Sequence, residues 1–221
     1  MLTAAAVCPH PPLLVPELAS GAARELDDVR ARCATAVEAL GDYDVLYVVG
    51  IDSQPHATSF APWGVDVRVD VPEPLPLAVL VGAWLTRGRT RSFVAVDPSL
   101  DSGECAALGA ELAASADRVA LLVMGDGSAR HDVKAPGYVD DRARAFDQDV
   151  RSVFAAADWT GLAALDPSLA DELLVAGRAP WQVLAGAATA NATVAVDATF
   201  TTPYGVGYHV AGWTWAASTW Q

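Results

Sequence analysis

The amino-acid sequence predicts an α/β fold: a single domain with a mainly parallel central sheet flanked by helices on both faces. Short apolar runs alternate along the chain with longer segments in which apolar residues recur every three or four positions, which indicates alternating strands and helices. The apolar runs are continuous, as in strands that are covered on both faces. The 221 residues contain no repeat or linker and are 52% hydrophobic, so we expect one domain over residues 1–221.

Five apolar runs are expected to form the strands of this sheet, at residues 3–8, 44–49, 92–96, 119–124 and 193–200, and a last extended segment follows at 206–215. The helices are expected at about 26–40, 75–87, 102–116, 138–153, 167–175 and 180–190. Two helix ends carry specific signals. Gly41 closes the first helix, and Asp101 with Glu104 is placed to form a capping box at the start of the third.

The charge of the chain restricts its partners. Its 14 Lys and Arg residues against 27 Asp and Glu give a formal net charge of −13, which disfavours nucleic acid and anionic membranes, because both require a basic footprint. No basic segment precedes the apolar start, and no apolar run is long enough to span a bilayer, so we predict neither signal peptide nor membrane span. Cys8, Cys33 and Cys105 are far apart, as expected for reduced cysteines in a cytoplasmic protein.

A proline-rich turn, Pro9-His10-Pro11-Pro12, ends the first predicted strand. No regular element continues through these prolines, so His10 is expected on a rigid backbone at the carboxyl end of the strand. Ligands of open α/β sheets bind at this edge. The alternative is a histidine whose ring only hydrogen-bonds carbonyl groups of the turn.

Two further histidines, His56 and His131, also follow predicted strands, so they and His10 could converge at one sheet edge. Two imidazoles and a carboxylate form the facial triad of non-haem Fe(II) enzymes, and a third histidine beside the metal could act as acid and base. The alternative is again that these histidines only satisfy turns, because neither an HxH nor an HExxH spacing is present.

Several other motifs have two interpretations. The turn at residues 125–128, Gly-Asp-Gly-Ser, is expected to be a plain glycine-rich turn, with an anion-binding nest as the alternative, since it lacks the lysine of a P-loop. Four aspartates of the long helix are interpreted as a solvated acidic face: Asp140, Asp141, Asp147 and Asp149. Trp213, Trp215 and Trp220 are expected in the core or at a subunit contact of a homo-oligomer; an aromatic wall for a flat substrate is the alternative.

Four segments in this order resemble the class III extradiol ring-cleavage dioxygenases: VCPHPPLLVPEL, DVLYVVGIDSQPH, GDGSARHDVKAPGY with the helix after it, and GRAPWQVLAGAA. The likeness is to the catalytic B-subunit superfamily, which also contains the Memo-like proteins, and within it to a small branch of Ala-rich bacterial members. It covers essentially the whole chain, and the order and spacing of the motifs carry it.

The resemblance implies roles for particular residues. The two metal-binding histidines of the family match His10 and His56, and its acid–base histidine is nearest to His131, three residues after Ser128. The helix that follows the metal-binding carboxylate matches at Trp181. The position of the carboxylate itself falls on residues 177–179, Gly-Arg-Ala, with Glu172 upstream as a weak substitute.

Three functional hypotheses follow from the resemblance. The first is an Fe(II)-dependent dioxygenase that cleaves a small catecholic aromatic substrate. The second is a metal-degenerate relative that binds a ligand or a protein at the same cleft, and the third is a metal-assisted hydrolase of a small molecule. Because the carboxylate is missing and Arg178 stands near its place, we expect weak, incomplete metal binding and slow or absent catechol cleavage.

Overall fold

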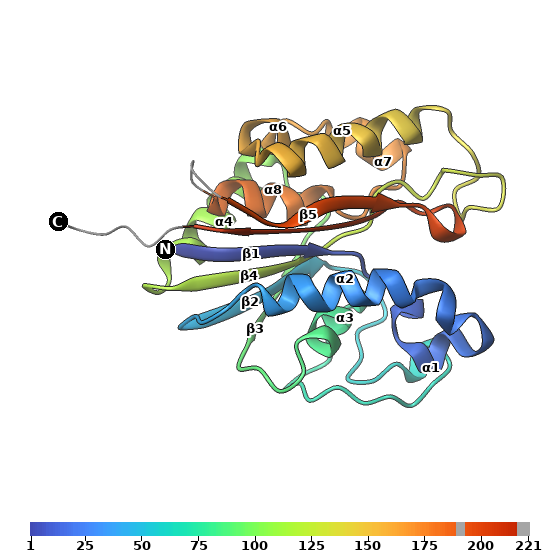
Figure 1. Ribbon diagram of the computed structural model, residues 1–221, viewed down its shortest axis with the longest axis horizontal. Helices are drawn as coiled ribbons and strands as arrows, with labels where there is room; N and C mark the ends of the chain where they lie inside the picture. The colour runs from blue at the N-terminus through green and yellow to red at the C-terminus, as the bar shows by residue number, and fades with distance from the viewer. Residues whose placement is uncertain (189–192, 216–221) are drawn as a thin grey trace.

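A six-stranded sheet forms the centre of the computed structural model, which describes residues 1–188 and 193–215 (Figure 1). The strands lie in the order β3-β2-β4-β1-β6-β5. Their bounds are Leu2–Cys8 (β1), Val45–Ile51 (β2), Ser92–Val96 (β3), Val119–Met124 (β4), Thr193–Thr201 (β5) and Tyr208–Thr214 (β6). The prediction of one mainly parallel sheet is confirmed, because β1 to β4 all pair in parallel.

The last two strands are the antiparallel part of the sheet. Residues 193–200 lie in it as predicted, and β5 is an edge strand that pairs antiparallel with β6, which pairs antiparallel with β1. The reason is the length of the connection. Residues 202–207, which include the turn η4 (Pro203–Gly205), suffice for a hairpin, whereas a parallel crossover needs about a dozen residues or more.

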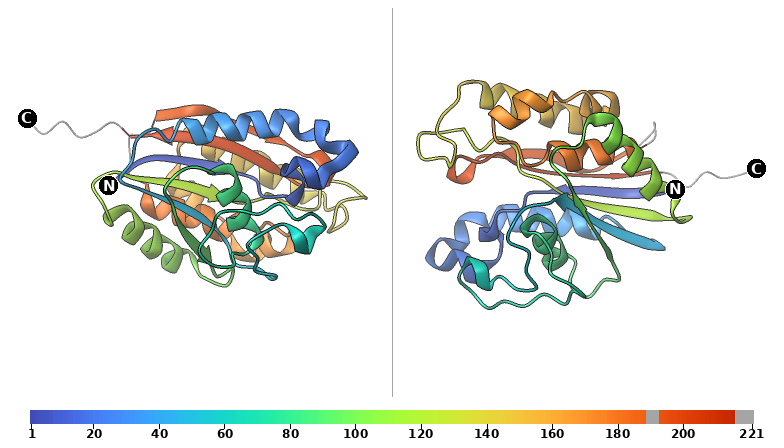
Figure 2. Two further views of the ribbon diagram at one scale, coloured as in Figure 1. Left: turned by 90° about the horizontal axis from the view of Figure 1, so that it is seen from below. Right: turned by 180° about the vertical axis from the view of Figure 1, so that it is seen from behind.

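Helices cover both faces of the sheet, as predicted (Figure 2). One face is covered by α2 (Asp27–Glu38) and α3 (Leu77–Leu85), with the short α1 (Pro16–Ala19) and the 3-10 turns η1 (Pro12–Leu14), η2 (Ser20–Leu26) and η3 (Ala61–Trp63) near them. The other face is covered by α4 (Ser102–Ala114), α5 (Arg142–Ala156), α6 (Trp159–Ala163), α7 (Pro167–Glu172) and α8 (Arg178–Ala187). Within the described residues, no helix combines the length and apolarity needed to cross a bilayer.

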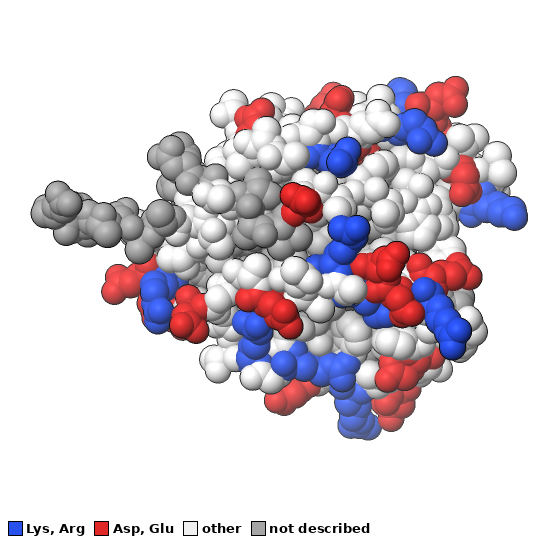
Figure 3. Space-filling model, in the orientation of Figure 1, with Lys and Arg blue, Asp and Glu red and all other residues white. Residues whose placement is uncertain are grey.

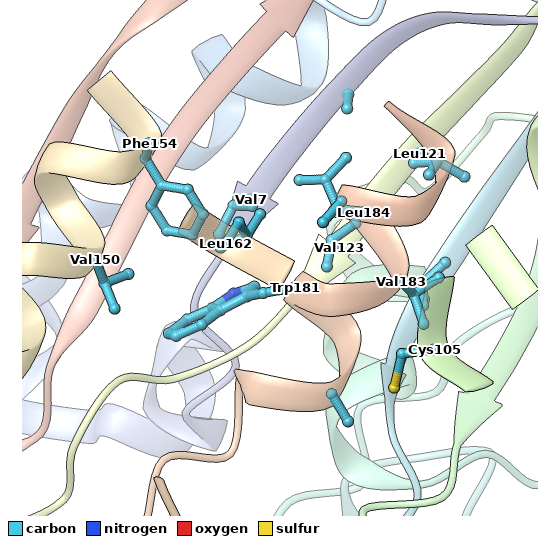
Figure 4. Close-up of a cluster of buried hydrophobic side chains, with 14 of the residues drawn as sticks. Val7, Cys105, Leu121, Val123, Val150, Phe154, Leu162, Trp181, Val183 and Leu184 are labelled. Carbon is cyan, nitrogen blue, oxygen red and sulfur yellow. The ribbon is translucent and has the colours of Figure 1, made fainter. Parts of the chain in front are cut away.

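The side chains of each strand alternate between two apolar layers. Val7 of β1 belongs to the layer under α5 and α8, whereas Cys8 belongs to the layer under α2 and α3. The first layer is built around the buried rings of Phe154 and Trp181, which meet edge to face at 5.4 Å (Figure 4). Trp213 is buried in the same layer and donates its indole N–H to the carbonyl of Phe154, so its predicted core position is confirmed.

Two other predicted features have clear outcomes. The capping box of α4 is confirmed, because Asp101 accepts the Glu104 N–H and the Glu104 carboxylate accepts the Asp101 N–H. The long helix begins at Arg142 instead of Tyr138, which is exposed and has a left-handed backbone (φ 58°) that a helix does not continue through. Trp215 packs partly buried against the core, and Trp220 lies outside the described residues.

Candidate functional site

His10 and Asp126 leave the carboxyl edge of the sheet side by side. They follow β1 and β4, which pair in register up to Cys8 and Met124, and the Gly125 N–H continues the pairing to the Cys8 carbonyl. The His10 backbone N–H donates to Asp126 Oδ1 at 2.8 Å, and His10 Nδ1 lies 3.6 Å from the same oxygen. The two side chains are 10% and 14% exposed, so both reach the surface at a small area. The predicted position of His10 at this edge is confirmed.

Asp147 lies fully buried behind this pair, which corrects its assignment to a solvated acidic face. Its carboxylate accepts three hydrogen bonds: from His131 Nε2 at 2.6 Å, from His209 Nε2 at 2.7 Å and from the Ser128 N–H at 3.0 Å. A buried carboxylate is stable only when it is paired and hydrogen-bonded in this way. Asp147 therefore connects α5 to β6 and to the loop that follows β4.

Two glycines give the Asp147 carboxylate its space. A Cβ atom on Gly127 would lie 2.2 Å from Oδ1, and one on Gly207 would lie 2.4 Å from Oδ2. The two glycine segments are joined by the Gly127 N–H to the Gly207 carbonyl and by the Gly207 N–H to the Ser128 carbonyl. The glycine-rich turn at residues 125–128 therefore surrounds the Asp147 carboxylate, to which the Ser128 N–H donates a hydrogen bond.

The five side chains His10, Asp126, His131, Asp147 and His209 form one electrostatic unit, which we call the histidine–aspartate cluster. Burial raises the pKa of Asp126, while the charges of His10 and His209 oppose the rise. Burial would also raise the pKa of Asp147, but the hydrogen bonds from His131 and His209 outweigh it, so this pKa lies below its usual value. Asp147 is therefore the permanent anion of the cluster, and Asp126 is the carboxyl that more readily holds a proton.

Three buried nitrogen atoms, on two histidines of the cluster and on the tryptophan that packs against one of them, have no hydrogen-bond partner among the described residues: His10 Nδ1, His209 Nδ1 and Trp181 Nε1. The Trp181 ring meets His209 edge to face at 5.6 Å, and its Nε1 would lie 2.7 Å from a Cβ atom on Gly125. An unpaired buried polar atom costs about 1–3 kcal/mol. Such atoms commonly mark the place of a water molecule or a ligand.

The structure brings His131 into this cluster but places His56 elsewhere. His56 Nε2 lies 2.6 Å from Asp52 Oδ1, and both side chains are substantially exposed. In the described part of the chain, no group of three or more His, Cys, Asp or Glu side chains is arranged to hold a metal ion. The assignment of His10 and His56 as two ligands of one metal stays a prediction, and no contact of the structure supports it.

The residues near the expected metal carboxylate do not provide a substitute. Gly177 lies under the indole of Trp181, where a Cβ atom would come within 2.2 Å of the ring. Arg178 is buried, but its guanidinium donates to the carbonyls of Pro98 and Leu100 and so does not enter a metal position. Glu172 forms an exposed ion pair with Arg142 at 2.7 Å. The donor set of this chain therefore does not fit the iron centre that the resemblance implies.

Three members of the cluster were absent from the sequence-based set of site residues: Asp126, Asp147 and His209. Asp126 stands directly after a predicted strand, and Asp147 falls on the apolar stripe of α5 between Phe146 and Val150, so both had a detectable signal. His209 had none, because its relation to the cluster depends on the antiparallel pairing of β6 with β1.

Comparisons with known proteins support the fold alone. No family model matches the chain, and no curated protein matches it either. Among solved structures, the chain is similar to an uncharacterized protein, JW3007, from Escherichia coli K12. The two share 14% sequence identity with a TM-score of 0.56, over 95% of this chain and 99% of that one. At this identity the similarity describes the arrangement of strands and helices and nothing of the site.

Proposed function

We propose that the chain is a metal-degenerate relative of the class III extradiol dioxygenases and binds a small hydroxylated aromatic molecule at His10 and Asp126 without a metal ion. One observation carries this proposal. An imidazole and a carboxyl group, both slightly exposed, lie with His10 Nδ1 3.6 Å from Asp126 Oδ1, and this buried nitrogen has no hydrogen-bond partner among the described residues. Their place at the carboxyl edge of the sheet, where ligands of open α/β sheets bind, supports it.

A hydroxyl group complements this pair because it both donates and accepts a hydrogen bond. It would donate to the Asp126 carboxylate, whose charged form is disfavoured by burial, and would accept from His10 Nδ1 when that nitrogen carries a proton. One tyrosine lies near this pair. Burial raises the pKa of the Tyr208 hydroxyl, and the charge of Asp126 adds to the rise, so Tyr208 lies close enough to Asp126 to interact with it electrostatically.

The remainder of the cluster would hold the binding pair in place. His209 is fixed by its hydrogen bond to Asp147 and lies close enough to Asp126 to influence its pKa. His131 holds the other carboxylate oxygen of Asp147. His209 and His131 therefore hold the charged Asp147 carboxylate in a fixed position behind His10 and Asp126. In this proposal they do not contact the ligand.

Fe(II)-dependent ring cleavage is the second candidate, favoured by the place of His10 at the end of β1. The available metal ligands argue against this candidate. His56 is bonded to Asp52, and the expected position of the carboxylate ligand holds Gly177, which has no side chain, and Arg178, which bonds carbonyl groups. A metal-assisted hydrolase would require the same missing ligands. We therefore derive no metal-dependent step for this chain, and the proposed site is one of binding.

The experiment is an NMR titration of the histidine side chains with 4-methylcatechol in buffer that contains a chelator. Saturable shifts of the His10 signals are expected, and 4-methylanisole, which lacks both hydroxyl groups, should not produce them. His10→Ala and Asp126→Asn should each weaken binding at least tenfold, which corresponds to about 1.4 kcal/mol. His56→Ala, the matched control, should leave the affinity unchanged. An equal loss in His56→Ala, or no binding in the wild-type chain, contradicts the proposal.

A cytoplasmic location belongs to the same proposal. Cys8, Cys33 and Cys105 are all buried and unpaired, which agrees with a reducing compartment.

A further inference from the structure

A basic hollow lies at the free edge of the sheet, separate from the pair of His10 and Asp126. It has a volume of about 280 Å³ and is lined by residues of α2 (Arg32), α5 (Gln148, Arg151) and β5 (Thr199, Phe200, Thr201). The two helices pack on opposite faces of the sheet, so the arginines flank the edge strand β5 from both sides. Figure 3 shows both basic and acidic side chains on the face of the molecule that carries β5.

The two arginines have unused hydrogen-bond donors. Arg151 donates its Nε–H to the Ala198 carbonyl at 3.2 Å, while its terminal nitrogens have no partner among the described residues. Arg32 is exposed and makes no hydrogen bond or ion pair with the described part of the chain. No carboxylate lines the hollow, although the chain has 27 acidic residues. A guanidinium presents a planar set of donors that matches carboxylate and phosphate oxygens.

The remaining lining residues fit the same class of ligand. Thr201 and Gln148 add a hydroxyl and an amide donor, and the ring of Phe200 adds an apolar surface. The Thr199 hydroxyl already donates to the Val210 carbonyl at 3.3 Å. A volume of about 280 Å³ lies just below the range for small-molecule pockets, roughly 300–1,000 Å³, so the ligand must be small. We propose that this hollow binds a small organic oxyanion, whose carboxylate or phosphate group lies between Arg32 and Arg151 and whose apolar part lies against Phe200.

Phe200 connects this hollow to the histidine–aspartate cluster. Its ring stacks on His209 at 4.9 Å with an interplanar angle of 21° and contacts His131 at 5.5 Å. Both histidines hold the Asp147 carboxylate. An anion that binds over Phe200 is therefore expected to shift the NMR signals of His209 and His131 without contacting them.

The test is calorimetric and NMR titration of the full chain at low ionic strength with inorganic phosphate, benzoate and phenyl phosphate. Binding is expected to be saturable and to weaken with added salt, because it depends on two exposed cations. Phenyl phosphate is expected to bind more tightly than inorganic phosphate because of Phe200. A preference for phosphate or for benzoate identifies which oxyanion the hollow takes, and either result supports the proposal.

Three variants test the assignment of residues. Arg32→Gln and Arg151→Gln should each weaken binding at least tenfold, whereas Arg144→Gln, an exposed arginine of the same helix α5 outside the hollow, should change it less than twofold. Arg32→Gln removes no contact of the described fold, so a folding defect does not obscure its result.

Absence of saturable binding, or an equal loss in Arg144→Gln, overturns the proposal. Arginines at an edge strand also prevent its pairing with another chain. If protection of the edge were their only role, Arg32→Gln and Arg151→Gln would form larger species in light scattering, and the wild-type chain would bind none of the three anions.

Discussion

Asp147→Asn is the substitution with the largest expected effect on stability. The carboxylate is fully buried and accepts hydrogen bonds from two histidines and one backbone N–H. Asparagine keeps the shape but loses the charge, and its amide group presents N–H donors where the carboxylate presented an acceptor. Hydrogen bonds to charged groups contribute about 1.5–3 kcal/mol each, and removal of one partner of a buried ion pair costs about 3–5 kcal/mol. We therefore expect a loss of about 3 kcal/mol or more.

The assay is urea unfolding at pH 7, with thermal unfolding as a second measurement. For a domain of this size, 3 kcal/mol corresponds to a decrease in Tm of roughly 6–12 °C. Asp149→Asn is the matched control: it is the same substitution at an exposed position of α5, and its effect should lie within about 0.5 kcal/mol. A loss below about 1 kcal/mol in Asp147→Asn would refute the inference that this carboxylate holds the cluster together.

The pH dependence of stability gives an independent check of the same residue. The pKa of Asp147 is lower in the folded chain than in the unfolded chain, where it is about 3.9. Its contribution to stability is therefore fully present above about pH 3.9 and is lost as the pH falls through the lower folded pKa. The Asp147→Asn variant should not show this loss of stability at acid pH. The difference in free energy of unfolding between the wild-type chain and the variant should therefore shrink as the pH falls.

Three further substitutions have defined outcomes. Gly127→Ala should destabilise the fold by about 2 kcal/mol or more in urea unfolding, because the added methyl group would lie 2.2 Å from the Asp147 carboxylate. Its control is Gly21→Ala, which has nothing within 4 Å and should be neutral or slightly stabilising. Asp126→Asn should maintain or raise stability at pH 7 while it weakens catechol binding at least tenfold. Burial raises the pKa of the Asp126 carboxyl, so the wild-type chain loses stability as the pH rises from about 3.9 through the folded pKa, and the variant should not. Gly177→Glu should unfold at a lower temperature and gain no metal by elemental analysis, because its Cβ atom would lie 2.2 Å from the indole ring beside it; increased iron content would contradict this.

The sequence was sufficient for the parts of the fold that depend on local signals. The runs at 92–96 and 119–124 are strands with the predicted bounds, since continuous apolar residues between turn signals leave little ambiguity. The capping box of α4 was read from Asp101 and Glu104 because its geometry depends on one helical turn alone. The antiparallel β5 and β6 hairpin was not predicted, although the short connection between the segments at 193–200 and 206–215 is a signal for it.

The candidate site was less accessible to sequence analysis. His10 was found because the surrounding prolines fix its place after β1. Asp147 was misread as solvated, since a charged residue on a helix is usually exposed, and only the spacing with Phe146 and Val150 placed it on the buried face. The partner that stabilises it, His209, lies 62 residues away in the chain, and no local pattern connects the two.

The measurement that tests the central claim most directly is the affinity of the chain for 4-methylcatechol, determined anaerobically by calorimetry in chelator and again after addition of Fe(II). Because His10 and Asp126 would bind the hydroxyl groups without a metal, we predict dissociation constants that agree within twofold. Binding that requires stoichiometric Fe(II) and is lost in His10→Ala would contradict the account, since it would mean that this chain assembles an iron centre from ligands other than those its contacts indicate.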